Sequence, residues 1–240
     1  MKNIIATIWS ESFKVIRSKV FYLTFIFFSI MPIMYGLMGF IQNNPELAHN
    51  IGSIGAGVTL HGTANWISYL GNLNQGVAGA GIVGFAFVAS WIFGREYSER
   101  TIKDLLALPV SRSSIVLAKL IVMFIWCFLL SLYMFAIGVI VGMVINFDGL
   151  SVRILIHCLN RFIVTAILAM IISTPAAFLA NVTRGYLLPI GLTILTYAVL
   201  SMVNSNSLPI YRSPRVYQFD YYLLNRGIGI TWNFFMVEIC

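Results

Sequence analysis

Three residues in one apolar stretch of this chain have types and a spacing that could bind an anion. Arg153, His157 and Arg161 follow one another at intervals of four, so a helix would place them close to one face. Charged side chains in such a stretch usually face a bundle interior or water, and they mark functional sites. These three could hold a pyrophosphate or a carboxylate. The alternative is that Arg153 and His157 are interfacial anchors and that Arg161 extends outward to polar headgroups.

Other catalytic and ligand-binding patterns are weak or missing from the sequence. Met31, Met34 and Met38 share a helix face, and thioethers suit Cu(I), but no Cys/His cluster accompanies them and methionine is also an ordinary gap filler. The sequence contains no G-x-x-x-x-G-K-[ST] phosphate loop, no Ser-His-Asp spacing and no H-E-x-x-H helix. We therefore predict that the chain is not an enzyme and binds no metal or cofactor itself.

The densest group of charges lies in residues 94–112, between two apolar stretches. Ser98 could cap a helix that begins at Glu99, and Pro109 would end it, because the residue before a proline avoids the helical region. Oppositely charged pairs four positions apart would each stabilise this helix by about 0.3–0.5 kcal/mol. The pairs are Glu96 with Arg100, Glu99 with Lys103, and Arg100 with Asp104; the apolar stripe is Ile102, Leu105 and Leu106. We predict a helix at 98–108 that contacts a partner, the alternative being a loop helix lying flat on a membrane.

The composition predicts that both the basic set at 153–161 and the charged segment at 94–112 belong to an all-α integral membrane protein. The chain is 59% hydrophobic and only 10% charged, with a mean hydropathy of +0.89, whereas a soluble domain carries about 25% charged residues. A span needs about 20 apolar residues, so 240 residues allow five to six spans. The net charge of +7 does not indicate nucleic acid, because the basic residues are scattered between the apolar stretches, where we expect them to face anionic lipid headgroups.

We expect one transmembrane domain over residues 1–240. Its apolar stretches predict spans at about 20–41, 76–93, 114–145, 154–180 and 186–203, with a polar connection at 42–75. Residues 221–239 form a weak sixth span, since a central arginine such as Arg226 costs about 2.5–3.5 kcal/mol. If that span is missing, through divergence or truncation, the C-terminus would lie outside.

Two further patterns concern helix surfaces. Residues 3–19 predict an amphipathic interface helix, or simply the basic flank of the first span. Its apolar side holds Ile5, Ile8, Trp9, Phe13 and Ile16, and Glu11, Lys14, Arg17 and Lys19 lie elsewhere. In the second span, Gly76, Ala80 and Gly84 repeat every four residues, which predicts close helix packing.

The distribution of lysine and arginine predicts the orientation. With a cytosolic N-terminus, most basic residues fall on the inner side, as the positive-inside rule requires. The inner residues are Lys2, Lys14, Arg17, Lys19, Arg95, Arg100, Lys103, Arg112, Lys119 and Arg184, and the outer ones are Arg153, Arg212 and Arg215.

The charged segment also resembles a known family. Glu96, the run Leu105-Leu106-Ala107-Leu108-Pro109, Ser111-Arg112 and Lys119 are similar to the signature of type 2 ABC transporter permeases. The resemblance extends over residues 1–203 and is closest to the short permeases of bacitracin- and lantibiotic-type peptide resistance. The weak final segment departs from the family's usual sixth span.

This resemblance implies that residues 98–108 are a coupling helix that docks on a separate cytosolic ABC ATPase, which binds the ATP and Mg. The apolar side chains inserted into the ATPase groove would be those of Ile102, Leu105 and Leu106. The polar residues around them would be Arg100, Lys103 and Asp104. The coupling helix would be fixed to the membrane-spanning helices by Glu96 and Arg112. It also implies a second permease copy or homologue, membrane lipid as surroundings, and export of an amphiphilic or peptide-like substrate from a prokaryotic cytoplasmic membrane.

Two other functions remain open from the sequence. A secondary transporter or channel without an ATPase predicts acidic residues within spans and inverted repeats, neither of which is evident in the confident spans. A non-transporting sensor or accessory subunit could also use a capped cytosolic helix.

Overall fold

The computed structural model describes residues 2–44, 64–98, 112–183 and 185–207, and every structural statement below concerns these residues. They are almost entirely helical and contain no strand, only an isolated bridge between Asn65 and Asp148. The helices are α1 (Lys2–Ile16), α2 (Lys19–Asn43), α5 (Trp66–Gly76), the π-helix η1 (Val77–Gly81), α6 (Ile82–Ser98), α8 (Arg112–Ile145), α9 (Val152–Val182) and α10 (Leu187–Ser207). Two compact units divide the chain, residues 1–199 and residues 200–240.

Four helical segments are long and apolar enough to cross a membrane, judged by length and composition. They are Lys19–Asn43, Trp66–Arg95, Ser113–Ile145 and Val152–Val182, and a shorter apolar helix covers Leu187–Val199. The predicted all-α membrane class is thereby confirmed. The weak sixth span at 221–239 and residues 99–108 of the predicted coupling helix lie outside the described residues.

The second membrane helix begins ten residues earlier than its apolar run predicts. Residues 66–75, expected to belong to a polar connection, form α5. Asn65 starts this helix with a capping box, in which its side chain accepts from the Ser68 amide while the Ser68 hydroxyl accepts from the Asn65 amide. Trp66, Tyr69 and Leu73 are then buried along one face, so tertiary packing compensates for the polar residues between them.

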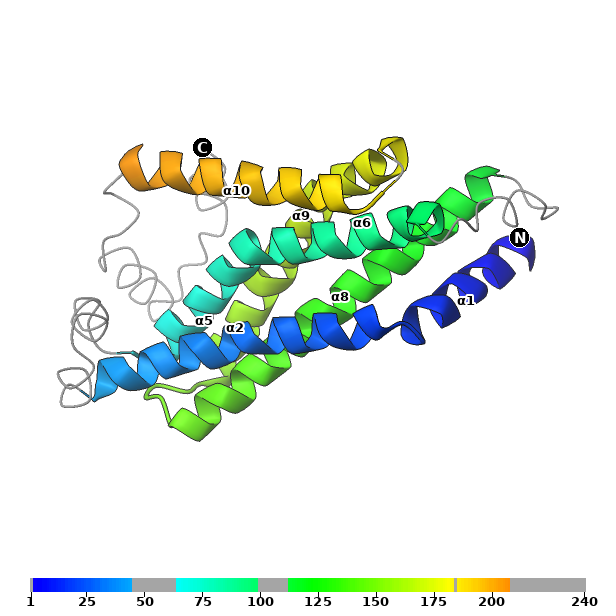
Figure 1. Cartoon of the computed structure of the whole chain (residues 1–240). Helices are drawn as coiled ribbons and strands as arrows, with labels where there is room; N and C mark the ends of the chain where they lie inside the picture. Colours follow the sequence, from blue (N-terminus) through cyan, green and yellow to red (C-terminus); the bar gives the residue numbers. More distant parts are fainter. Residues whose placement is uncertain (1, 45–63, 99–111, 184, 208–240) are drawn as a thin grey trace. The chain divides into compact units, whose positions relative to one another are not determined.

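Within the first unit, α2 packs mainly on α8, and α6 on α9 (Figure 1). The contact between α2 and α6 depends on a small residue. A Cβ on Gly84 would lie 2.8 Å from the ring of Phe28, which is fully buried and stacked on Phe85 with ring centroids 5.5 Å apart. A larger side chain at Gly84 would therefore have to displace this ring pair.

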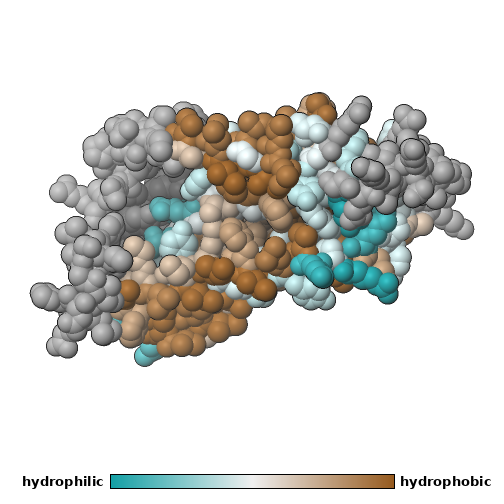
Figure 2. Space-filling model, in the orientation of Figure 1, coloured by the Kyte–Doolittle hydropathy of each residue, from teal (hydrophilic) through white to brown (hydrophobic). Residues whose placement is uncertain are grey.

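The outer surface of these helices is strongly apolar. Figure 2 shows continuous hydrophobic surface over α2 and α8, and hydrophilic residues gathered at the α1 end of the molecule. Large apolar side chains exposed on α2 include Tyr22, Leu23, Ile26, Ile30, Met34 and Leu37. Such a surface is suited to lipid tails.

Candidate functional site

Helix α1 presents its apolar stripe outward and a polar residue inward. Trp9 is 72% exposed and Ile5 is 68% exposed, whereas Glu11 is only 3% exposed and Val15 is buried beside it on the same face. This inner face packs against α8. Helix α1 is therefore attached to the bundle through a carboxylate and an aliphatic side chain, and its apolar stripe is left for the surroundings.

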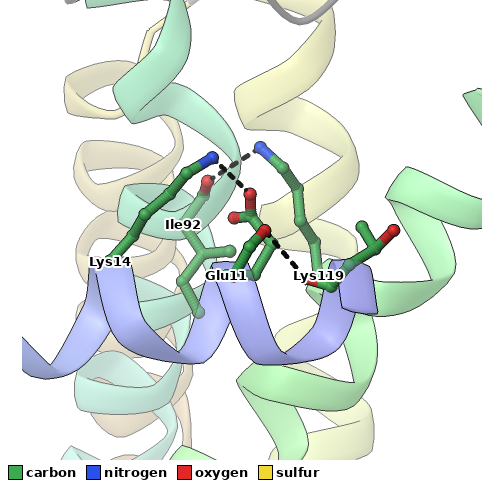
Figure 3. A network of polar contacts seen from close by, with 6 residues as sticks. Glu11, Lys14, Ile92 and Lys119 are labelled. Carbon is green, nitrogen blue, oxygen red and sulfur yellow. Dashed lines mark hydrogen bonds and ion pairs between the residues drawn. The ribbon is translucent and has the colours of Figure 1, made fainter. Parts of the chain in front are cut away.

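The buried carboxylate belongs to a group of polar residues that we call the junction cluster: Glu11 and Lys14 of α1, Ile92 of α6 and Lys119 of α8 (Figure 3). Lys14 Nζ donates to Glu11 Oε1 at 2.6 Å. Lys119 Nζ, whose side chain is 4% exposed, donates to the Ile92 carbonyl oxygen at 3.4 Å. Charged side chains are almost never buried unless they are paired or hydrogen-bonded. The Lys119 bond joins α8 to α6, whereas the ion pair lies within α1, which packs on α8.

Aromatic rings lie beside Lys119 and beside the neighbouring Arg95 of α6. The Lys119 ammonium lies 5.8 Å from the centroid of the Phe93 ring, and the Arg95 guanidinium lies 4.8 Å from that of Trp91. Trp91 in turn packs edge-on against Trp126 of α8, with centroids 5.9 Å apart. Cations over aromatic faces are stabilised by the ring quadrupole, more strongly where water is excluded.

The last turns of α6 are also fixed to the end of α9. Tyr97 donates its hydroxyl proton to Asn181 Oδ1 at 2.7 Å. A Cβ added to Gly94 would meet the backbone of Gly185 and Tyr186 at 2.8–2.9 Å, so the two chain segments can approach this closely only with glycine at position 94. The C-terminal end of α6 is thus held on two sides, by α9 and by Lys119 of α8.

The bond between Lys119 and Ile92 lies close to the segment that connects α6 with α8. Ile92 lies near the end of α6, and Lys119 lies two turns into α8. The segment 99–111 joins these two helices, so the junction cluster is located at the base of both of its attachments.

Most of the coupling residues predicted from the sequence fall in or beside this segment. Glu96 belongs to the backbone of α6, which continues to Ser98, and Arg112 is the first residue of α8, but both side chains lie outside the described part. The other predicted coupling residues lie outside it entirely: Glu99, Arg100, Ile102, Lys103, Asp104, Leu105, Leu106 and Pro109.

The predicted anion-binding residues lie in the first three turns of α9. Arg153 is exposed, and His157 and Arg161 are half-buried. The carbonyl of Arg161 accepts from the Thr165 hydroxyl at 3.0 Å. The described residues hold no group of three or more His, Cys, Asp or Glu side chains that could bind a metal.

The predicted small-residue stripe lies along α5, η1 and α6. Gly76 faces the ring of Tyr35, and Gly84 faces that of Phe28, both on α2. Ala80 lies between them within η1, where the wider π turn shifts the helical register.

Sequence reasoning missed Glu11, Tyr97 and Asn181 as structural anchors. A signal for Glu11 is present, because it shares a helix face with Ile8 and Val15, at the spacing of a buried stripe. No comparable pattern pairs Tyr97 with Asn181, since their contact depends on how α6 packs on α9.

Comparison with known proteins gives one family and one relative. Residues 7–201 match the family model described as ABC-2 family transporter protein. Over 123 residues the chain is 32% identical to the bacitracin transport permease protein BCRB of Bacillus licheniformis, which covers 51% of this chain and 59% of that relative. The match thus spans less than two thirds of the relative's length. No solved structure matches the chain.

Proposed function

The chain belongs to the ABC-2 family of transporter proteins, and we propose that it is the membrane-spanning subunit of an ABC exporter driven by a separate cytosolic ATPase. The sequence has no phosphate-binding loop of its own. ATP and Mg would therefore be bound by the ATPase. The substrate would be an amphiphilic or peptide-like molecule in a prokaryotic cytoplasmic membrane.

The observation that carries this proposal is the junction cluster at the base of α6 and α8. A loop that merely joined two spans would not need a buried lysine on one helix bonded to the last turns of the other. Because packed interfaces shift between discrete arrangements rather than deform smoothly, a force on residues 98–108 would move α6 and α8 together. This is the property that a transmission point requires.

Coupling would then proceed in three steps. ATP-driven closure of the ATPase subunits moves the helix at 98–108, whose Ile102, Leu105 and Leu106 form the apolar contact. Lys119 and the contacts around Ile92 carry that displacement into α6 and α8. Tyr97 and Gly94 pass it to the end of α9, so that the membrane helices rearrange around a substrate path formed with a second permease copy or homologue.

The substrate proposal rests on the relative, whose name identifies it as a bacitracin transport permease protein. We extend this to cell-wall-active peptides as a class. Arg153, His157 and Arg161 would supply basic groups to an anionic part of such a substrate near the outer surface.

The experiment is a tolerance assay in a bacitracin-sensitive bacterium that expresses the chain with its ATPase. We expect growth at higher concentrations of bacitracin or another cell-wall-active peptide. This gain should disappear when the ATPase is absent or carries a hydrolysis-defective substitution. Tolerance that persists without ATP hydrolysis would indicate a secondary transporter. Hydrolysis stimulated by the chain without any transport would indicate an accessory subunit.

A variant of the junction cluster tests the transmission step. Lys119→Gln should lower ATP-dependent tolerance several-fold while the ATPase still co-purifies with the chain, because docking and transmission are separate steps. Thr196→Gln is the control, since Thr196 is an exposed polar residue on α10. Equal activity of the two variants would contradict a role for the cluster in transmission.

A further inference from the structure

We infer that the outward face of α1 binds the headgroups of anionic phospholipids, and that this lipid contact helps to hold α1 against α8. This lipid contact would not depend on which substrate is transported.

The apolar part of this surface is exposed and continuous. Ile5, Trp9, Phe13 and Ile16 all have roughly half or more of their surface open, although α1 is packed on the bundle. Trp9 and Phe13 lie with ring centroids 6.5 Å apart. Exposed aromatic and aliphatic side chains along one side of a helix are typical of insertion into the boundary between headgroups and acyl chains.

The charges on this surface specify the type of lipid. Lys14 of α1, Arg17 just after α1 and Lys19, the first residue of α2, are all exposed. The Arg17 guanidinium lies 4.5 Å from the centroid of the Phe13 ring, which belongs to the apolar stripe. The acidic residue of α1, Glu11, is buried on the opposite side. The exposed charges of this region are therefore all basic, and they border the side chains that would insert, which is the arrangement that attracts anionic headgroups.

Lys14 connects the lipid surface with the protein interior. Its side chain is 43% exposed, and its ammonium is bonded to the buried Glu11 carboxylate at 2.6 Å. A phosphate bound by Lys14 would thus lie beside the contact that joins α1 to α8. A headgroup at this place, with Arg17 and Lys19, would fix the angle of α1 on the bundle and thereby support the junction cluster.

The experiment measures which lipid contacts Trp9 in the full-length chain. The protein is reconstituted in phosphatidylcholine vesicles that contain a minor fraction of brominated phosphatidylglycerol or brominated phosphatidylcholine, because bromine quenches tryptophan fluorescence only at short range. Trp66, Trp91 and Trp126 are buried in the protein. Subtracting the signal of Trp9→Phe isolates the contribution of Trp9 from that of every other tryptophan.

We expect brominated phosphatidylglycerol to quench Trp9 more strongly than brominated phosphatidylcholine. The preference should fall when Lys14, Arg17 and Lys19 are each changed to Gln, by up to about fivefold for each charge removed. Exchange of the same residues between lysine and arginine should preserve this preference. Arg153→Gln should also preserve it, because it removes a basic residue from the first turn of α9 and not from this surface. Raised salt should weaken the preference for brominated phosphatidylglycerol, because it screens the charges. Soluble glycerol phosphate should not reduce this preference.

Three outcomes would overturn the inference. Equal quenching by the two lipids would mean that α1 lies in the interface without selecting charge. No quenching by either lipid would mean that a protein surface, such as a second copy, covers Trp9. Displacement by soluble phosphate would identify a phosphate site rather than a lipid site. The salt dependence of the unmodified chain gives an answer even if the triple variant does not fold, and none of these results bears on ATP-driven transport.

Discussion

A carboxylate that is only 3% exposed, on the inner face of α1, needs a specific partner. Glu11 has such a partner in Lys14, which lies three positions later on the same helix. Exposed ion pairs contribute about 0–1 kcal/mol, but hydrogen bonds to charged groups contribute about 1.5–3 kcal/mol when the acceptor is shielded from water. The energetic importance of Lys14 therefore derives from the burial of Glu11.

A comparison of two lysines tests this at the residue scale. Lys14→Gln should destabilise the folded chain by about 1–3 kcal/mol, because the buried carboxylate loses its ammonium partner. Lys19→Gln, at an exposed position, should change the unfolding free energy by no more than about 0.5 kcal/mol. Denaturant unfolding in mixed micelles provides the measurement. Equal effects of the two substitutions would show that the ion pair adds nothing to stability.

The sequence alone predicted an apolar side of α1 with Ile5, Ile8, Trp9, Phe13 and Ile16. Four of these side chains are exposed, whereas Ile8 is half-buried against the core. The sequence did not indicate which polar residue would be buried. That choice is made by α8, on which α1 packs through Glu11 and Val15. A contact between helices that are distant in sequence leaves no periodic signal in either one.

At the scale of the elements, the local contact between Phe28 of α2 and α6 should depend on Gly84. Gly84→Ala should destabilise the protein by about 1–3 kcal/mol, because the new Cβ would lie 2.8 Å from the buried ring of Phe28. Gly191→Ala in α10 is the control, since a Cβ there has no neighbour within 4 Å and alanine is the better helix former by about 1 kcal/mol. The measurement is the melting temperature of each variant in detergent. An equal loss of stability in both variants would contradict a specific contact between Gly84 and Phe28.

Helix positions follow closely from the apolar runs, and the exception has a physical cause. The predicted spans at 114–145 and 154–180 correspond to α8 (Arg112–Ile145) and α9 (Val152–Val182). The run at 76–93 missed α5, where Asn72 and Asn74 lower the hydropathy although Leu70 and Leu73 are buried. A capping box and burial on one face determine that helix, and a hydropathy average over its residues does not detect them.

At the scale of the whole molecule, the positive-inside rule predicts that the N-terminus is cytosolic. Helix α8 has 34 residues, or about 50 Å at 1.5 Å per residue, which exceeds the roughly 30 Å hydrocarbon core. Its two ends should therefore lie on opposite sides of the bilayer, with Lys119 near the cytosolic side and the turn at Leu150 outside.

Cysteine labelling tests this orientation. In a chain whose native cysteines are replaced, Leu150→Cys should react with a membrane-impermeant maleimide in intact cells, because Leu150 is exposed in the turn after α8. Ser10→Cys, on the exposed side of α1, should react only after the membrane is permeabilised. The opposite pattern would reverse the orientation and place residues 99–111 outside the cytosol.

The central claim is that a separate ATPase drives this chain through residues 98–108. Cross-linking from Ile102→Cys in native membranes, with the endogenous cysteines replaced, tests it most directly, and Leu150→Cys is the control on the other side. The account predicts a specific adduct between position 102 and a soluble nucleotide-binding subunit, with a yield that changes when ATP is added, and no such adduct from position 150. A folded, membrane-inserted chain that forms no adduct with any ATPase from position 102 would contradict it.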